Sequence, residues 1–180
     1  MKEESDGALL RRVLSGEPRT YARLVDRYQA RLGRYALRML GNKDDAEDAV
    51  QDTFIRAYRS LGRCEGDGFG PWVFGILVNR CRTHATKRAR TQGVIVRSEV
   101  ALATASVASS EGRDALRDAI DWALKQLPAE QREAFLLKHV EDMSYEAMET
   151  VTGVRPATLR MRVFRARDEL RKLLAETVRD

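Results

Sequence analysis

The chain has few of the features that hold small secreted proteins together, and it has no long apolar run. Only two cysteines, Cys64 and Cys81, occur among 180 residues, and two cannot form the disulfide framework of a fold this size. No stretch approaches the roughly 18 apolar residues of a membrane span. The opening residues, MKEESD, are polar and precede no apolar signal core. We therefore expect a protein without membrane insertion that stays in the cytoplasm with both thiols reduced.

Groups that bind metals or carry out catalysis are also scarce. The chain has two histidines, and although Cys81 and His84 have the spacing of a metal-binding pair, no third and fourth ligand lies nearby. The scattered carboxylates form no cluster of the kind that holds a catalytic metal. The sequence predicts no catalytic residue, no metal and no cofactor, and it assigns no role to Cys64 or Cys81.

Charge is plentiful and unevenly distributed. The composition is that of a globular protein, with 43% hydrophobic and 33% charged residues and a formal net charge of +5. From Gly68 to Ser98 there is no acidic residue, and this segment carries Arg80, Arg82, Lys87, Arg88, Arg90 and Arg97. A short preceding stretch is crowded with Asp44, Asp45, Glu47, Asp48 and Asp52. This segregation predicts two charged partner surfaces, one acidic and one basic.

Apolar residues recur at helical spacing along nearly the whole chain. In the first half, helices are expected at residues 6–14, 20–40, 44–61 and 71–90. Asp44 is expected to cap the third helix with Glu47 as its capping-box partner, and Pro71 to lie in the first turn of the fourth. In the second half, helices are expected at residues 113–127, 129–140, 144–152 and 156–176.

Residues 91–112 differ from both halves. They are small, polar and rich in Ala and Ser, without an aromatic anchor, which predicts a flexible linker, although the alanines also allow a transient helix. The predicted fold is therefore all-α, with two small helical domains, residues 1–90 and 113–180, joined by a flexible linker over 91–112.

The last two helices have the pattern of a helix-turn-helix. Ser144 caps a short helix, Gly153 ends it, and Pro156 starts a longer basic one. On that second helix, Leu159, Val163 and Ala166 recur at spacings of three and four and should face the core. This rotation predicts that Arg162 and Arg165 lie together on the opposite surface, in reach of one DNA groove.

Other polar residues of this helix suit DNA equally well. Arg155 and Thr158, at its N-terminus, are placed for phosphates, where amides and the helix dipole favour an anion. Arg160 also stands off the core stripe. The competing interpretation is an ordinary Arg-rich helix face exposed to solvent.

Two further constellations are candidates for binding. The segment from Trp72 to Arg82 places aromatic residues beside Asn79 and arginines, which suits an unpaired DNA strand. The competing interpretation is that Trp72 is mostly core and that Asn79 caps or bridges backbone. In the acidic helix, capping accounts for the first acids, but Asp48, Gln51 and Asp52 share an outward face that capping does not explain.

Together these segments resemble the sigma-70 superfamily of transcription initiation factors. DAEDAVQDTFIRAYRSL is similar to the family's core-binding helix, and FGPWVFGILVNRCRTHATKR to its promoter-melting segment. LPAEQREAF, followed by MSYEAMETVTGVRPATLRMRVFRARDEL, is similar to its C-terminal promoter-binding domain. The additional conserved regions of the large housekeeping factors are missing, so the chain resembles the compact two-domain extracytoplasmic-function group.

The resemblance implies roles for particular residues. It implies that Asp48, Gln51 and Phe54, with Asp52 on the same face, seat the chain on the clamp helices of core RNA polymerase. The residues that match the segment capturing an unpaired base of the minus-10 element are Phe69, Trp72, Asn79 and Arg80, and its basic surface continues through Arg82, Lys87 and Arg88. Arg160, Arg162 and Arg165 match the helix face that reads the minus-35 element.

The resemblance also implies partners. These are core RNA polymerase, through its clamp helices and flap, promoter DNA, and an anti-sigma factor, with the free chain a monomer. Catalysis would belong to the polymerase.

Some positions depart from the family pattern. Glu149 stands where a small Ala usually packs in the first helix of the helix-turn-helix. Ala157 replaces a usual Gly and Met161 a usual Ser, and Thr83 with His84 stand where an Asp is common. These departures leave the promoter sequence open.

Two other classes compete with this interpretation. A helix-turn-helix regulator of another class would need a sensor half with a ligand pocket or a receiver Asp at a strand end, and the first half shows no strand pattern. A nucleic-acid enzyme would need the metal-binding cluster that is missing.

Overall fold

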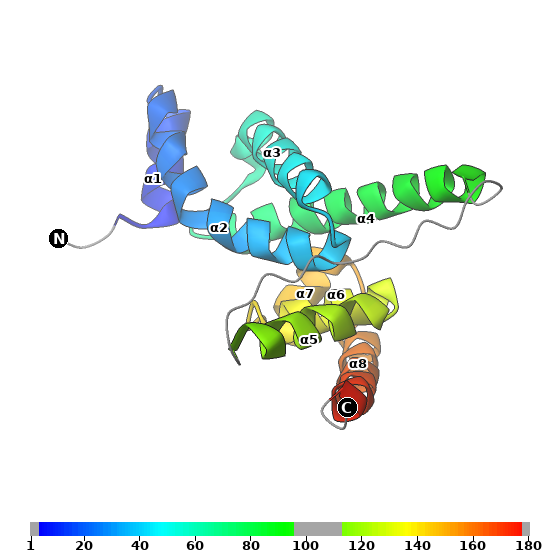
Figure 1. Cartoon of the computed structure of the whole chain (residues 1–180). Coiled ribbons are helices and arrows are strands. Elements are labelled where there is room, and N and C mark those ends of the chain that lie inside the picture. The colour runs from blue at the N-terminus through cyan, green and yellow to red at the C-terminus, as the bar shows by residue number, and fades with distance from the viewer. Residues whose placement is uncertain (1–3, 96–112, 178–180) are drawn as a thin grey trace.

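The computed structural model describes residues 4–95 and 113–177, and within these ranges the chain is helical, without a strand. The N-terminal domain contains α1 (Asp6–Leu14), η1 (Pro18–Thr20), α2 (Tyr21–Leu40), α3 (Lys43–Arg59), η2 (Leu61–Arg63) and α4 (Phe69–Ile95). The C-terminal domain contains α5 (Arg113–Gln126), α6 (Ala129–His139), α7 (Tyr145–Thr152) and α8 (Pro156–Thr177). Figure 1 shows the first group above the second, with α4 extending past the other helices. The predicted all-α fold is confirmed.

The core of the N-terminal domain lies where α2, α3 and α4 meet. Leu24, Leu32 and Tyr35 of α2 and Phe74 of α4 are fully buried, and the rings of Tyr35 and Phe74 meet edge to face at 5.8 Å. Aromatic pairs in this geometry add to the stabilisation from apolar burial. α1 packs beside α2 through Leu9, which is also fully buried.

In the C-terminal domain, α6 and α7 pack against α8. Leu136 and Leu137 of α6 and Met148 of α7 are fully buried together with Leu159 of α8. The predicted ends of α7 are confirmed: the Oγ atom of Ser144 accepts a hydrogen bond from the Ala147 amide at 3.1 Å, and Gly153 ends the helix at φ 71°. A left-handed residue at this position favours glycine.

The predicted cap of the third helix and the predicted end of the fourth helix were wrong. The third helix is capped by Asn42, whose side chain accepts a hydrogen bond from the Asp45 amide at 2.9 Å. Asp44 therefore lies inside the first turn, and Glu47 pairs with Lys43 at 3.7 Å instead of closing a capping box. The fourth helix starts at Phe69, so Pro71 lies in its first turn as predicted, but the helix continues to Ile95, which is beyond the predicted start of the linker at residue 91. The rest of the predicted linker lies outside the described residues.

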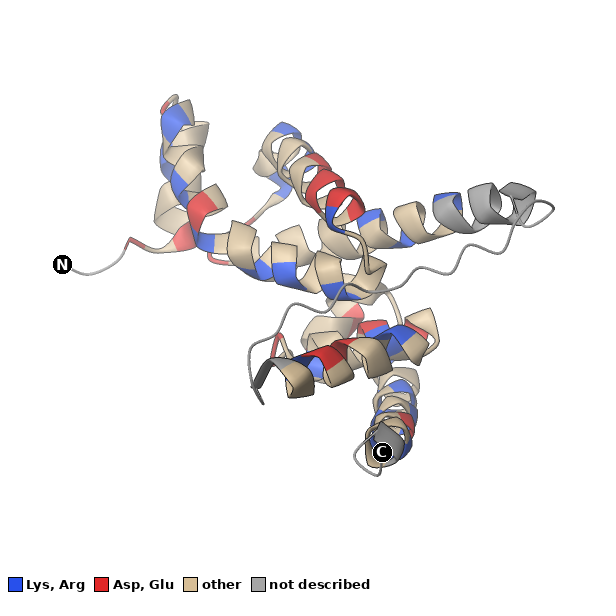
Figure 2. Cartoon of the chain, in the orientation of Figure 1, with Lys and Arg blue, Asp and Glu red and all other residues tan. Residues whose placement is uncertain are grey.

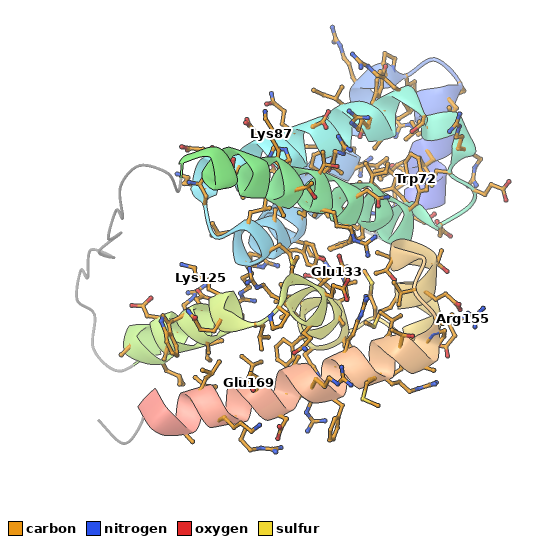
Figure 3. The ribbon with its side chains drawn as sticks, turned by 90° about the vertical axis from the view of Figure 1, so that its right-hand side faces the viewer. Trp72, Lys87, Lys125, Glu133, Arg155 and Glu169 are labelled. Atoms are coloured by element: carbon orange, nitrogen blue, oxygen red, sulfur yellow. The ribbon has the colours of Figure 1, made fainter. Side chains whose placement is uncertain are left out.

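The two domains are in contact through a polar surface that we call the domain seam, formed by Arg31 and Arg82 opposite Glu141 and Glu133. Arg82 binds Glu133 through two nitrogens, at 2.8 and 2.6 Å. Arg31 pairs with Glu141 and also donates to its carbonyl oxygen at 3.0 Å. Figure 3 shows Glu133 between the upper and lower layers of helices.

The seam also has an apolar part and a cavity. α7 lies against α4 at Gly75, where an added Cβ would be 3.7 Å from the carbonyl oxygen of Val151. A cavity of about 830 Å³ beside the seam is lined by residues of both domains, among them Cys81, Arg82, Lys125, Arg132 and Arg162.

Candidate nucleic-acid and partner interfaces

The long helix of the helix-turn-helix, α8, presents a polar outward face. Leu159, Val163, Ala166 and Leu170 are buried as predicted. Arg155, Thr158, Arg160 and Arg165 are exposed, and Figure 3 shows Arg155 at the start of this helix. Long exposed donors on a protruding helix suit phosphates and base edges.

Arg162 does not lie on that outward face, so its predicted placement beside Arg165 was wrong. Its guanidinium binds Glu130 of α6 at 2.5 Å, and its side chain is only 20% exposed. An ideal helix places residue 162 about 60° from Leu159, because successive residues turn by about 100°. Arg162 therefore flanks the core, where α6 reaches it.

Two exposed apolar residues on α8 were not predicted as part of the site. Met161 is 51% exposed and Phe164 is 69% exposed, which is unusual for large apolar side chains on a helix whose opposite face is buried. Their exposure could have been read from the spacing, because neither belongs to the stripe that contains Leu159 and Val163.

Two polar residues of the helix-turn-helix, Glu149 and Arg160, lie at its surface. Glu149 is exposed, so it does not enter the packing of α7, whose buried residues are Met148, Val151 and Thr152. Arg160 lies with its guanidinium carbon 5.1 Å from the centre of the Tyr145 ring. This cation–π contact holds Arg160 near the start of α7.

The aromatic segment at the start of α4 is partly structural. Phe69 is fully buried, so the prediction that it offers a surface to DNA does not hold in this conformation. Its ring packs against Tyr28 at 5.3 Å and against Trp72 at 5.9 Å. Trp72 itself is half-buried. The buried ring of Phe69 therefore helps to hold the ring of Trp72 in place.

Asn79 is exposed on α4 even though Val78 before it and Cys81 after it are buried. Only its backbone is used locally, because its carbonyl oxygen accepts a hydrogen bond from the Thr83 hydroxyl at 2.8 Å. Within the described residues the side-chain amide makes no hydrogen bond, so capping or bridging does not account for it. The amide is free to bind the edge of a base.

The basic residues after Asn79 differ in their contacts and exposure. Arg80 binds Asp52 at 3.2 Å, and Arg82 is held by Glu133. Lys87 is exposed near the projecting part of α4 (Figure 3), and the side chain of Arg88 lies outside the described residues. Arg82 is therefore not available to DNA while the domain seam is closed.

The acidic face of α3 borders a groove between α2 and α3. Figure 2 shows acidic residues on the first half of α3 and basic residues along the outer part of α4. Asp48 and Gln51 are exposed as predicted, whereas Phe54 is only 8% exposed and lies in the wall of the groove. The groove has a volume of about 640 Å³ and is also lined by Val25 and Leu37.

Asp52 has a fixed charge. Burial alone would raise its pKa, but hydrogen bonds from Arg56 and Arg80 outweigh it and lower the pKa below its usual value. Ile55 on the same helix is 43% exposed and was not predicted as part of this face. Its exposed side chain adds apolar area next to the carboxylates of this helix.

Neither a metal site nor a membrane span emerges from this geometry. Across residues 4–95 and 113–177, no group of His, Cys, Asp and Glu side chains is placed to hold a metal ion. No described helix is both long and apolar enough to cross a membrane.

Comparison with known proteins gives two family matches that follow the two domains. Residues 24–91 match the model of sigma-70 region 2, and residues 117–170 match that of sigma-70 region 4. Over its whole length, the chain is 30% identical to RNA polymerase sigma-H factor of Pseudomonas aeruginosa, covering 99% of that protein. The chain belongs to the sigma-70 family. It is a member of the extracytoplasmic-function group.

Other relatives agree with this assignment. RNA polymerase sigma factor CarQ of Myxococcus xanthus is 33% identical, over 93% of this chain and 96% of CarQ. The extracytoplasmic-function sigma-E factor of Escherichia coli is 28% identical, with 92% of each chain covered.

Two solved structures share the arrangement of this sigma-family chain. CnrH, in complex with the cytosolic domain of CnrY, has a TM-score of 0.70 and 26% identity, over 95% of this chain and 97% of CnrH. RpoE of Bartonella quintana, in complex with the anti-sigma factor NepR, also has a TM-score of 0.70, with 30% identity over 86% and 96%.

Proposed function

We propose that the chain directs promoter-specific transcription initiation as the sigma subunit of RNA polymerase. The observation that carries the proposal is Asn79, an exposed and uncommitted amide between the buried residues Val78 and Cys81. An unpaired base presents edges that such an amide can bond, and Trp72 offers a ring for stacking. Sigma factors are DNA-binding regulators rather than classical enzymes, so bond chemistry belongs to the polymerase.

Core polymerase is proposed to bind the acidic face of α3 and the adjoining groove. Asp48 and Gln51 supply exposed polar groups, and Ile55 supplies apolar area. This combination, an apolar strip with charges at its rim, suits the clamp helices of the polymerase. Phe54 contributes through the wall of the groove.

The minus-35 element is proposed to bind α8. Arg165 and Arg160 stand exposed for base edges, and Arg155 and Thr158 lie near the helix N-terminus for phosphates. Arg162 reaches DNA only if it exchanges Glu130 for the promoter.

The minus-10 element is proposed to bind at α4. Trp72 and Asn79 take the unpaired base, and Lys87 together with Arg80, Arg82 and Arg88 supplies the basic track for the strand. Because Arg82 is bound to Glu133 across the domain seam, full engagement requires the two domains to separate. The closed form is proposed to be the free, monomeric state.

An anti-sigma factor is proposed to regulate the chain. Both similar solved structures are complexes, and the protein bound to RpoE in one of them is the anti-sigma factor NepR. The cavity beside the domain seam, lined by Lys125, Arg132 and Glu133, gives such a partner access to both domains at once. Binding there would hold the seam closed.

Reconstitution tests the proposal directly. Purified chain is mixed with core RNA polymerase, and transcript starts and permanganate-reactive thymines are mapped on a promoter library. Asn79→Ala should bind core normally and leave minus-10 thymines unreactive on duplex promoters, while Gln126→Ala, which removes an exposed amide on α5, should behave as wild type. Normal opening by Asn79→Ala would contradict the assignment.

Core binding needs its own test. Asp48→Lys should weaken binding to core polymerase by about tenfold or more while leaving helical content unchanged, because a like charge across an interface is strongly unfavourable. Asp118→Lys makes the same charge change on exposed α5 and serves as the control. Equal affinities for the two variants would show that α3 is not the docking face.

A further inference from the structure

The N-terminal helix α1 touches the loop that leads into α4, although the two are about 60 residues apart in sequence. The carboxylate of Asp67 in this loop accepts a hydrogen bond from the Gly7 amide at 2.6 Å. That amide belongs to the first turn of α1, where N–H groups have no partner within the helix. The Gly7 amide and the Ser5 side chain both lower the pKa of Asp67, so its charge is maintained.

Gly7 lets the loop approach this closely. An added Cβ at Gly7 would lie 2.8 Å from Oδ1 of Asp67 and 3.1 Å from the carbonyl group of Gly66. The backbone of Gly7 is ordinary α-helix, so the helix itself would accept and even prefer alanine. What excludes a side chain here is the loop.

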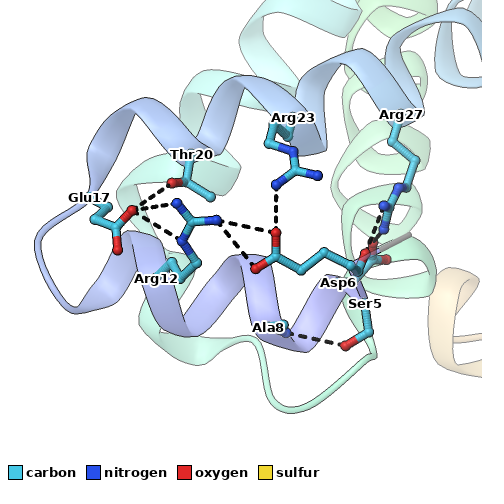
Figure 4. A network of polar contacts seen from close by, with 9 residues as sticks. Ser5, Asp6, Ala8, Arg12, Glu17, Thr20, Arg23 and Arg27 are labelled. Atoms are coloured by element: carbon cyan, nitrogen blue, oxygen red, sulfur yellow. Dashed lines mark hydrogen bonds and ion pairs between the residues drawn. The ribbon is translucent and has the colours of Figure 1, made fainter. Parts of the chain in front are cut away.

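The preceding residue, Asp6, holds the other end of the loop, where the loop joins α4. Its carboxylate is only 8% exposed and binds both Arg27 and the hydroxyl of Tyr28, and Figure 4 shows the Arg27 pair. The Tyr28 ring packs on Phe69 at 5.3 Å, and its hydroxyl would lie 3.0 Å from a Cβ at Gly70. Phe69 in turn supports Trp72.

We propose that residues 5–7 of the N-terminal helix position the loop 65–68 and Trp72 for capture of an unpaired promoter base, with Gly7 and Asp67 as positioning residues. The inference rests on the proposed function, because Trp72 and Asn79 are the residues that take the base. Asp67 fixes the loop tip, and Asp6 fixes the base of the loop through Tyr28 and Phe69. The first turn of α1 thereby sets the shape of a site to which it contributes no direct contact.

Three variants and a matched control test this inference in the full chain. Gly7→Ala inserts a methyl group between helix and loop, and Asp67→Ala removes the acceptor. Asp67→Asn keeps an oxygen in place and should rescue. The control is Glu17→Ala, which breaks the Arg12–Glu17 pair (2.6 Å) at the other end of α1 (Figure 4).

The first measurement is hydrogen exchange of residues 65–72 in the free chain, which does not depend on promoter function. Exchange should be about tenfold faster in Gly7→Ala and Asp67→Ala, and near wild type in Asp67→Asn and Glu17→Ala. Unchanged exchange in both Gly7→Ala and Asp67→Ala would overturn the inference.

The second measurement uses the holoenzyme on a duplex library randomised over the minus-10 segment. A second library carries the same sequences with the minus-10 segment already opened as a bubble. Gly7→Ala and Asp67→Ala should reduce duplex opening about tenfold and change the preferred unpaired base, with core affinity unchanged. If exchange rises but opening and base preference stay at wild-type values, the inference fails while the proposed function stands. If the wild-type holoenzyme opens no promoter, the proposed function fails, and the inference falls with it.

Discussion

Inside each domain the helices meet through apolar side chains, whereas the contact between the domains also includes buried carboxylates paired with arginines. Tyr35 and Phe74 in the N-terminal core are fully buried. At the domain seam, Glu133 and Glu141 are 4% and 5% exposed and are bound by Arg82 and Arg31. Apolar burial stabilises each fold strongly, but a buried ion pair gains little over two hydrated charges. We therefore expect each domain to stay folded when the seam between them opens.

The largest effect is expected inside a domain. Phe74→Ala should lower the free energy of unfolding by about 3–5 kcal/mol, because it removes a fully buried ring and leaves a cavity. Denaturant titration followed by circular dichroism measures this. Leu37→Ala, at a residue 46% exposed on α2, should change it by less than about 0.5 kcal/mol. Similar losses for the two would remove the contrast between core and surface.

At the seam, the expected result is separation without unfolding. Arg82→Ala removes both hydrogen bonds that the Arg82 guanidinium donates to the Glu133 carboxylate. A hydrogen bond to a charged group contributes about 1.5–3 kcal/mol. Moving Glu133 back into water is the easiest relief, so the radius of gyration from solution scattering should rise while helical content stays constant. Arg56→Ala breaks a surface pair with Asp52 and should leave the dimensions unchanged. A compact Arg82→Ala variant would show that the apolar contact of α7 with α4 closes the domains by itself.

An ion pair within a domain but near its surface should matter less. Arg162→Ala loses its ion pair with Glu130, which is 72% exposed, so stability should fall by less than about 1 kcal/mol.

For promoter reading, Arg165→Ala should reduce minus-35 discrimination by about 1–3 kcal/mol, while Arg155→Ala weakens all sequences alike and flattens the salt dependence. Holoenzyme binding to minus-35 variants at two salt concentrations separates these outcomes. Equal loss of discrimination in Arg162→Ala and Arg165→Ala would contradict the difference in their placement.

The smallest effect at neutral pH concerns the thiol of Cys81. Burial, with a contribution from the charge of Glu133, raises the pKa of Cys81 to about 12. The thiol should therefore react slowly at pH 8, because the thiolate is the nucleophile. Because the folded pKa is the higher one, the stability contributed by the neutral thiol is complete below the unfolded value near 9 and is lost as pH rises toward 12. Cys81→Ala should reduce that alkaline loss, measured as unfolding free energy against pH; an unaltered slope would contradict it.

Local signals in the sequence predicted the elements well, and the errors come from one competing local cap and from contacts distant in sequence. Ser144 and Gly153 mark α7 because cap and left-handed turn are chemically specific. Asn42 was missed because Asp44, two residues on, has an equally suitable side chain. The apolar stripe on α8 gave the buried face, but it did not show that α6 flanks that face at Arg162. The pairing of Arg82 with Glu133, 51 residues away, has no local signature.

Asn79, the proposed contact to an unpaired strand, and Arg82, which pairs with Glu133 across the domain seam, lie on the same continuous helix, α4. Asn79 and Arg82 lie less than one turn apart on this helix, so a strand held by the first is within reach of the second. A strand that draws on Arg82 competes with Glu133 for the same guanidinium. By thermodynamic reciprocity, any ligand that tightens domain closure lowers affinity for the strand by the same factor by which the strand lowers affinity for that ligand. An inhibitor of this chain therefore need not cover Asn79 at all; it can act as an antagonist at a distance by keeping one arginine occupied.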